Sequence, residues 1–106
     1  MREMRFVQRC YLVLISVIAL SGCCREKDIP DHINKLYSGS AKDRNQAALD
    51  LSRCGSSAAK AVPRLGQLIY DENVGVQSSA AYALRRIDTE EARKILERAE
   101  AARRRK

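Results

Sequence analysis

Apolar residues recur at intervals of three and four along the chain after residue 28, which is the spacing of amphipathic helices. Three such stripes are clear, and they consist of Ala58, Val62, Leu65 and Ile69; of Val76, Ala80, Leu84 and Ile87; and of Ala92, Ile95, Leu96 and Ala99. The spacing predicts helices over residues 30–38, 42–54, 58–70, 75–87 and 90–102, joined by short turns. Gly55 suits a helix end, Ser56 an N-cap, and Asp88-Thr89 the next cap.

The same region repeats itself at an offset of 33 residues. Ile29-Pro30 then aligns with Val62-Pro63, and Leu36-Tyr37 aligns with Ile69-Tyr70. In a second block, the aligned pairs are Ala47 with Ala80, Ala48 with Ala81, Leu51 with Leu84, and Cys54 with Ile87. A period in the thirties is typical of stacked helical hairpins, so the sequence predicts an all-α fold, a short α-solenoid.

The segment from Asp50 to Asp88 resembles the short HEAT-like repeats that are also found in phycobilin lyases. The residues that carry the resemblance are Gly55, Ala58, Pro63, Leu65, Leu68, Asp71, Val76, Ala80, Ala81, Leu84 and Ile87. The resemblance covers residues 29 to about 100 and implies a right-handed stack that binds partners, with little information on activity. Such repeats commonly begin with Val-Arg, whereas this chain has Asp43-Arg44 and Val76-Gln77, which puts a regular arginine ladder in doubt.

The first residues have the order of a secretory signal: basic residues up to Arg9, an apolar run over 10–20, and then small residues. Eleven residues span roughly 16 Å as a helix, which is short of a bilayer's hydrocarbon core of roughly 30 Å. The run is therefore too short for a membrane span.

Leu20-Ser21-Gly22-Cys23 resembles the lipobox of bacterial lipoproteins. The resemblance implies a signal peptide over residues 1–22, cleavage before Cys23, and a covalent lipid on that cysteine. Residues 23–28 would be the lipidated N-terminus and a short linker, and the protein would lie in the bacterial envelope. Because Cys24 replaces the aspartate of the inner-membrane retention signal, the periplasmic face of the outer membrane is favoured if the source is Gram-negative. An uncleaved or ordinarily cleaved signal, a Cys-Cys metal site and a vicinal disulfide are the alternatives.

The positive charge after the signal belongs mainly to the C-terminus. From Cys23 onward 17 basic residues face 12 acidic ones, a difference of five, and four of the basic residues are Arg103, Arg104, Arg105 and Lys106. This tail over 103–106 could contact anionic lipid, an acidic protein or nucleic acid, or be a solvated helix end. Nucleic acid is not expected in the envelope.

Catalytic chemistry has few candidates in this sequence. His32, the single histidine, falls beside an apolar stripe and is expected to be structural and partly buried. Cys54 aligns with a core position and is expected to be a small buried hydrophobe, although a disulfide with Cys24 is conceivable. Glu90 and Glu91 fit a helix start. No catalytic residue, metal or cofactor is expected.

We therefore expect a membrane-anchored, non-catalytic interaction module with an unknown envelope protein as partner, and self-association is an option. The repeat domain spans residues 29–102, and the candidate surface uses the exposed sides of 58–70 and 91–102. Its expected polar members are Lys60, Arg64, Gln67, Arg93 and Arg98. The alternatives are a small lipoprotein that acts on the membrane itself and a HEAT-like lyase or enzyme accessory subunit.

Overall fold

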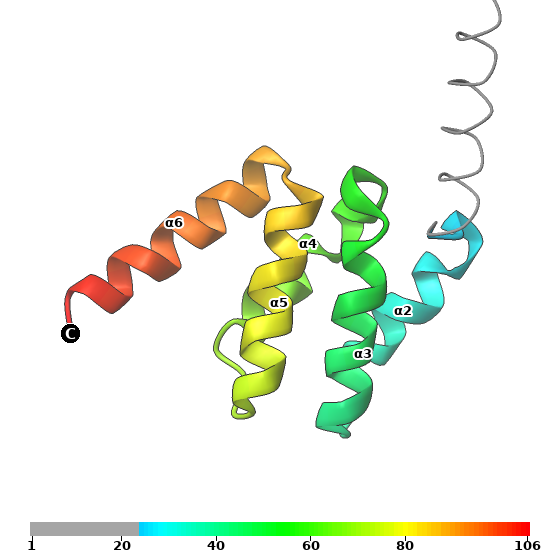
Figure 1. The fold of residues 1–106 in the computed structure, drawn as a ribbon, viewed down its shortest axis with the longest axis horizontal. Coiled ribbons are helices and arrows are strands. Elements are labelled where there is room, and N and C mark those ends of the chain that lie inside the picture. Colours follow the sequence, from blue (N-terminus) through cyan, green and yellow to red (C-terminus); the bar gives the residue numbers. More distant parts are fainter. Residues whose placement is uncertain (1–23) are drawn as a thin grey trace, which may run out of the picture.

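The computed structural model describes residues 24–106, and this part of the chain contains helices and no strand (Figure 1). The elements, in chain order, are the 3₁₀ helix η1 (Glu26–Asp28), α2 (Ile29–Lys35), α3 (Ala41–Ser52), the 3₁₀ helix η2 (Gly55–Ala61), α4 (Val62–Leu68), α5 (Val74–Ile87) and α6 (Glu90–Arg104). The predicted all-α class is confirmed. Helix α6 continues into the basic tail, two residues beyond the predicted boundary.

The helices form two layers of a short solenoid. Helices α3 and α5 run side by side in the same direction and make the most extensive contact of any pair (Figure 1). Helices α2 and α4 return in the opposite direction and pack on α3 and α5 respectively, while α6 diverges from α5 toward its C-terminal end (Figure 1). This arrangement is the stack of helical hairpins that the 33-residue period predicts.

The predicted stripes form the core between the layers. Its fully buried large side chains are Leu36, Leu51, Val62, Leu65, Val76, Leu84 and Ile87. Alanines fill most of the remaining buried positions, and their small side chains let adjacent helices approach closely. In α6 the stripe is only half-covered, because Ala92 and Ala99 are buried while Ile95 and Leu96 are partly exposed.

The single helix predicted over 58–70 is wrong in its first four residues. The backbone kinks at Ala58, and the segment over 55–61 is the 3₁₀ helix η2 before α4 begins at Val62. Pro63 explains the break, because its ring and missing N–H are tolerated in the first turn of an α-helix and not in its interior. Ser56 consequently lies inside η2 and does not cap an α-helix.

Three of the α-helices start with side-chain caps. Ser40, Asn73 and Thr89 accept hydrogen bonds from backbone N–H groups three residues later, at the starts of α3, α5 and α6. Thr89 confirms the predicted cap after Asp88, which itself ends α5 in a left-handed conformation with φ of 52°.

The turn after α3 depends on glycine. Gly55 has φ of +54°, and a Cβ there would meet only the Arg86 carbonyl oxygen, at 4.0 Å. The cost of Gly55→Ala is therefore backbone strain, and we expect it to lower the free energy of unfolding by about 1 kcal/mol in urea titrations of the full chain. Gly39→Ala is the control, because a Cβ there meets no atom within 4 Å and its φ is not positive. Equal losses in both variants would contradict this interpretation.

Candidate protein-binding surface

A buried ion pair joins the two repeats. The Arg44 guanidinium donates from Nε to Asp71 Oδ2 at 3.0 Å and from Nη2 to Asp71 Oδ1 at 3.1 Å, and both side chains are less than 10 % exposed. Arg44 Nη1 also donates to the Ser38 carbonyl oxygen at 2.8 Å. One side chain therefore connects the turn after α2 with the turn after α4. In the sequence Asp71 is one of the residues that carry the HEAT-like resemblance, and nothing there predicted this pair.

The same contacts change the acidity of Asp71. Its hydrogen bonds with Arg44, and secondarily with the Asn73 backbone N–H at 2.9 Å, lower the pKa of this carboxyl below its ordinary value. Burial opposes the shift but does not outweigh it. The carboxylate therefore stays charged in the folded protein to lower pH than in the unfolded chain.

The ion pair does not recur one repeat later. Gln77 is the counterpart of Arg44 at the 33-residue offset, and its Nε2 donates to the Asp71 carbonyl oxygen as Arg44 does to that of Ser38. The counterpart of Asp71 is Arg104, so the second position has neither member of the pair. A regular arginine ladder is thus absent from residues 24–106, as the departure from the Val-Arg pattern suggested.

Two of the predicted binding residues, Arg64 and Gln67, form hydrogen bonds within the chain. Arg64 donates to the Leu36 carbonyl oxygen from Nε and Nη2 at 3.2 and 3.1 Å, and from Nη1 to Gln67 Oε1 at 3.0 Å. Its guanidinium also lies 4.3 Å from the centre of the Tyr37 ring, a cation–π contact. Arg64 is half-buried, and its main role is to join α4 to the end of α2.

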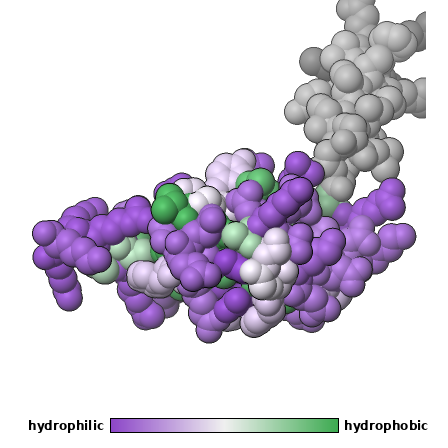
Figure 2. Space-filling view, turned by 90° about the horizontal axis from the view of Figure 1, so that it is seen from below, coloured by the Kyte–Doolittle hydropathy of each residue, from purple (hydrophilic) through white to green (hydrophobic). Residues whose placement is uncertain are grey.

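The other three predicted residues are exposed but do not share one recess. Lys60 lines a broad groove of about 650 Å³ between α2 and η2, where Pro30 and Ile33 are neighbours. Arg93 lies 3.8 Å from an Asp88 carboxylate oxygen, and Arg98 is solvent-exposed on α6. Figure 2 shows a mostly hydrophilic surface on the side viewed, with apolar residues in small groups.

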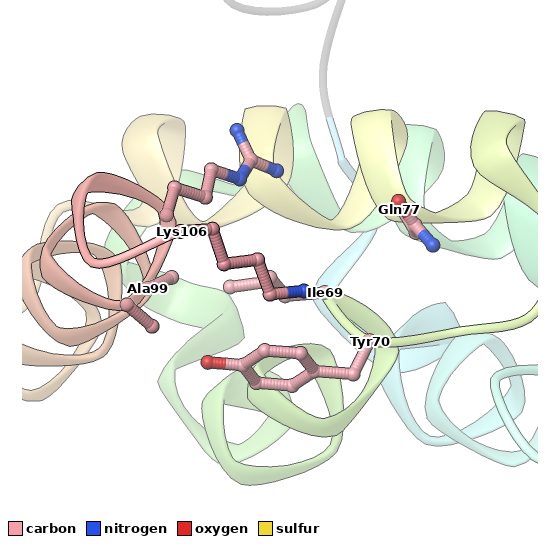
Figure 3. A pocket seen from close by; sticks show the side chains of 7 residues that line it. Ile69, Tyr70, Gln77, Ala99 and Lys106 are labelled. Atoms are coloured by element: carbon pink, nitrogen blue, oxygen red, sulfur yellow. The ribbon is translucent and has the colours of Figure 1, made fainter.

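The basic tail contributes to a second, smaller groove. A recess of about 310 Å³ lies where the end of α4, the start of α5 and the last turns of α6 meet (Figure 3). It is lined by Ile69, Tyr70, Gln77, Ala99, Ala102, Arg103 and Lys106. Two tail residues therefore face this groove, whereas Arg104 pairs with Glu100 at 3.9 Å and Arg105 is exposed elsewhere on the tail. None of the five residues predicted to bind a partner lines it.

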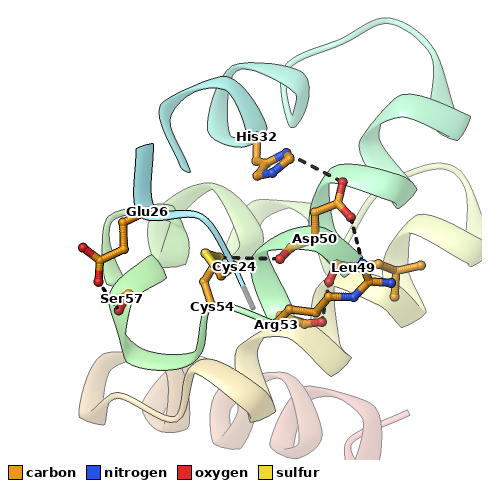
Figure 4. Close-up of a disulfide and its surroundings, with 9 residues drawn as sticks. Cys24, Glu26, His32, Leu49, Asp50, Arg53, Cys54 and Ser57 are labelled. Carbon is orange, nitrogen blue, oxygen red and sulfur yellow. Dashed lines mark hydrogen bonds and ion pairs between the residues drawn. A yellow bond between two sulfur atoms is a disulfide. The ribbon is translucent and has the colours of Figure 1, made fainter. Parts of the chain in front are cut away.

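The structure pairs Cys24 with Cys54 in a disulfide (Figure 4). Their Cα atoms are 4.7 Å apart, within the usual range for disulfides, and the pair is 30 residues apart in sequence. Cys54 was expected to be a small buried hydrophobe; it is half-buried and packs against the core, but it is bonded, and the pairing that the sequence left conceivable is the one found. Beside it, Ser57 Oγ donates to a Glu26 carboxylate oxygen at 3.3 Å. The disulfide and this hydrogen bond fasten residues 24–26 to the start of η2.

His32 occupies the predicted structural position. Its side chain is 21 % exposed, and Nδ1 lies 3.7 Å from Asp50 Oδ2. Asp50 in turn lies 3.7 Å from Arg53 Nη1, so the group is a small polar cluster between α2 and α3 (Figure 4). It contains no second histidine or nucleophile.

The predicted attachment residue Cys23 and the motif Leu20-Ser21-Gly22 lie outside the described residues. Within residues 24–106, no helix combines the length and hydropathy that crossing a bilayer requires.

Comparison with known proteins identifies the fold family. The family model described as HEAT repeats matches residues 29–105, which is most of the chain. The curated proteins and the solved structures give no match. The match spans both hairpins and the inter-repeat ion pair, and the chain belongs to the HEAT-repeat family.

Proposed function

We propose that the chain is a lipid-anchored protein-interaction module of the bacterial envelope, in which Cys23 carries the lipid and the HEAT repeats bind the partner. The Cys24–Cys54 disulfide carries the proposal. Disulfides persist in oxidising compartments such as the periplasm and are rare in the cytosol. The pairing also commits the Cys24 thiol, which leaves the adjacent Cys23, the cysteine of the lipobox-like motif, as the acceptor of the lipid.

The anchor would hold the repeats close to the bilayer. Two or three acyl chains, at about 0.8 kcal/mol per buried methylene, give stable attachment where a single chain does not. Cys24 follows the anchor directly and is bonded to Cys54 at the end of α3. The body would therefore follow the lipid without a flexible linker.

Binding suits the body because HEAT repeats present an extended surface of successive helices to partners. The Arg44–Asp71 ion pair, whose side chains are both largely buried, holds the turns after α2 and α4 together. Exposed carboxylates Glu90 and Glu100 pair with Lys94 and Arg104 four residues later, as their spacing predicts. These charges have structural explanations, and the grooves remain for recognition.

Metabolic labelling with an alkyne analogue of palmitate tests the anchor. We expect the wild-type chain to incorporate the label and to sediment with membranes, and Cys23→Ser to lose both, because the thiol that receives the lipid is gone. Cys24→Ser is the matched control: it removes the neighbouring cysteine and should keep the label. Density fractionation of the membranes is expected to place the labelled protein in the outer membrane of a Gram-negative host. Retained label in Cys23→Ser would refute the proposal.

A further inference from the structure

We infer that the groove between α4, α5 and α6 binds an acidic, amphipathic segment of a partner protein. This inference deepens the interaction function proposed above and assigns it to one recess. It rests on a comparison of two structurally equivalent junctions and on the charges that line the second one. The first junction is where the ends of α2 and α4 meet α3, and the second is where the end of α4 and the end of α6 meet α5.

The first junction is closed by charged side chains of the chain itself. Arg44 of α3 donates two hydrogen bonds to the Asp71 carboxylate of the following repeat, with N···O distances of 3.0 and 3.1 Å. Arg64 of α4 lies over the Tyr37 ring and caps the Leu36 carbonyl oxygen. The charged groups of Arg44, Asp71 and Arg64 therefore all have partners within the fold.

The second junction has the same backbone plan without these groups. At the 33-residue offset the tyrosine is kept, as Tyr70. Gln77 stands in place of Arg44, and Glu97 in place of Arg64. Within residues 24–106, Arg64 on Tyr37 is the only cation found over an aromatic ring, so no equivalent covers Tyr70. The recess of about 310 Å³ lies at this position.

The lining of the recess specifies the chemistry of its occupant. Arg103 and Lys106 supply two positive charges, no acidic side chain lines the recess, and neither residue forms an ion pair within residues 24–106. Figure 3 shows the Lys106 side chain extending from the end of α6 into the view of the recess, with the Tyr70 ring below it. Of the acids nearest along the chain, Asp71 pairs with Arg44 and Glu100 with Arg104, while Glu72 and Glu97 do not line the recess. A carboxylate from outside would thus meet two cations, Arg103 and Lys106, that have no ion-pair partner within residues 24–106.

The size and shape favour a peptide over a small molecule. The recess is at the lower end of the range for ligand pockets and is open, so it accepts a few side chains rather than a whole ligand. Ile69, Tyr70, Ala99 and Ala102 form the apolar part of the lining. A peptide with an apolar side chain on this part and one or two flanking carboxylates that reach Arg103 and Lys106 fits both the apolar and the basic lining.

The test is a binding assay with the full chain in detergent. The probes are three fluorescein-labelled 12-residue peptides with leucine at helical spacing i, i+4, i+7 and i+11, whose other positions are all Glu, all Gln or all Lys. We expect the Glu peptide to bind and the Gln and Lys peptides to bind at least about tenfold more weakly, because two unpaired cations attract it. Arg103→Glu with Lys106→Glu should weaken binding of the Glu peptide about tenfold or more.

Matched variants separate the groove from general tail charge. Arg104→Glu with Arg105→Glu changes the net charge equally, from the same helix end, and should alter affinity less than about twofold. Tyr70→Ala should weaken binding, whereas Tyr82→Ala, an exposed tyrosine outside the groove, should not. Equal losses in both charge variants, or no preference for Glu, would overturn the inference.

Two other occupants would also overturn it. Equal loss of binding to phosphatidylglycerol vesicles in both charge variants, with no peptide binding, would assign the tail to lipid. A dimer in sedimentation that Arg103→Glu with Lys106→Glu abolishes, again without peptide binding, would assign the groove to a second copy. These outcomes are independent of label on Cys23, so the groove can fail while the anchor stands.

Discussion

Removal of the disulfide, by Cys24→Ser or Cys54→Ser, is expected to lower the free energy of unfolding by about 3 to 4 kcal/mol. The bond closes a loop of 30 residues and so restricts the unfolded chain. It also fastens the segment before α2 to the start of η2. For about 80 folded residues, whose total stability is on the order of 4 to 12 kcal/mol, this is a large share.

Because Cys24 and Cys54 form a single bond, removing either one has the same effect as removing both. Chemical denaturation of the full chain should show equal losses for either variant, and the double variant should lose no more than either alone. Dithiothreitol should reduce the stability of the wild-type chain to that of the variants and leave the variants unchanged. A wild-type protein whose unfolding midpoint does not respond to dithiothreitol would contradict the pairing.

Asp71→Ala is expected to lower the free energy of unfolding by about 3 kcal/mol, since it leaves the Arg44 guanidinium buried without its carboxylate. The loss should be visible in urea titrations. Arg93→Ala is the control: it breaks the ion pair with Asp88, in which both side chains are more than 60 % exposed, and should cost less than about 0.5 kcal/mol. Similar effects of the two substitutions would show that the inter-repeat pair has no special role.

Acid should weaken the same contact. Because the folded-state pKa of Asp71 is lowered by Arg44, its contribution is complete above the unfolded-state pKa, near 3.8, and is lost as pH falls through the folded value. Stability of the wild-type chain should therefore decline below about pH 4, with a smaller decline in Asp71→Asn. An identical acid dependence in both would exclude Asp71 as a contributor.

The helices were predictable from the sequence because each buries one apolar stripe of helical period. The residues of the stripe from Val76 to Ile87 are all in the core. The boundary error at η2 has a physical cause: a 3₁₀ helix and an α-helix both bring residues three or four apart to one face, so periodicity does not separate them. Pro63 was the available signal for the break.

The contacts that define the site depend on pairs distant in sequence. Arg44 and Asp71 are 27 residues apart, and Cys24 and Cys54 are 30 apart, so residue types alone do not show that they meet. Part of the groove did have a local signal. The α6 stripe continues at helical spacing through Ala99, Ala102, Arg103 and Lys106, which separates these residues from Arg104 on another face.

The proposed anchor is tested most directly by the intact mass of the membrane-extracted protein without reduction, followed by fragmentation of its N-terminal peptide. If the protein is a lipid-anchored module, the chain begins at Cys23 and carries diacylglyceryl and acyl groups. Its first peptide is then released from the peptide that contains Cys54 only on reduction. A chain that retains Met1 and carries an unmodified Cys23 would contradict it.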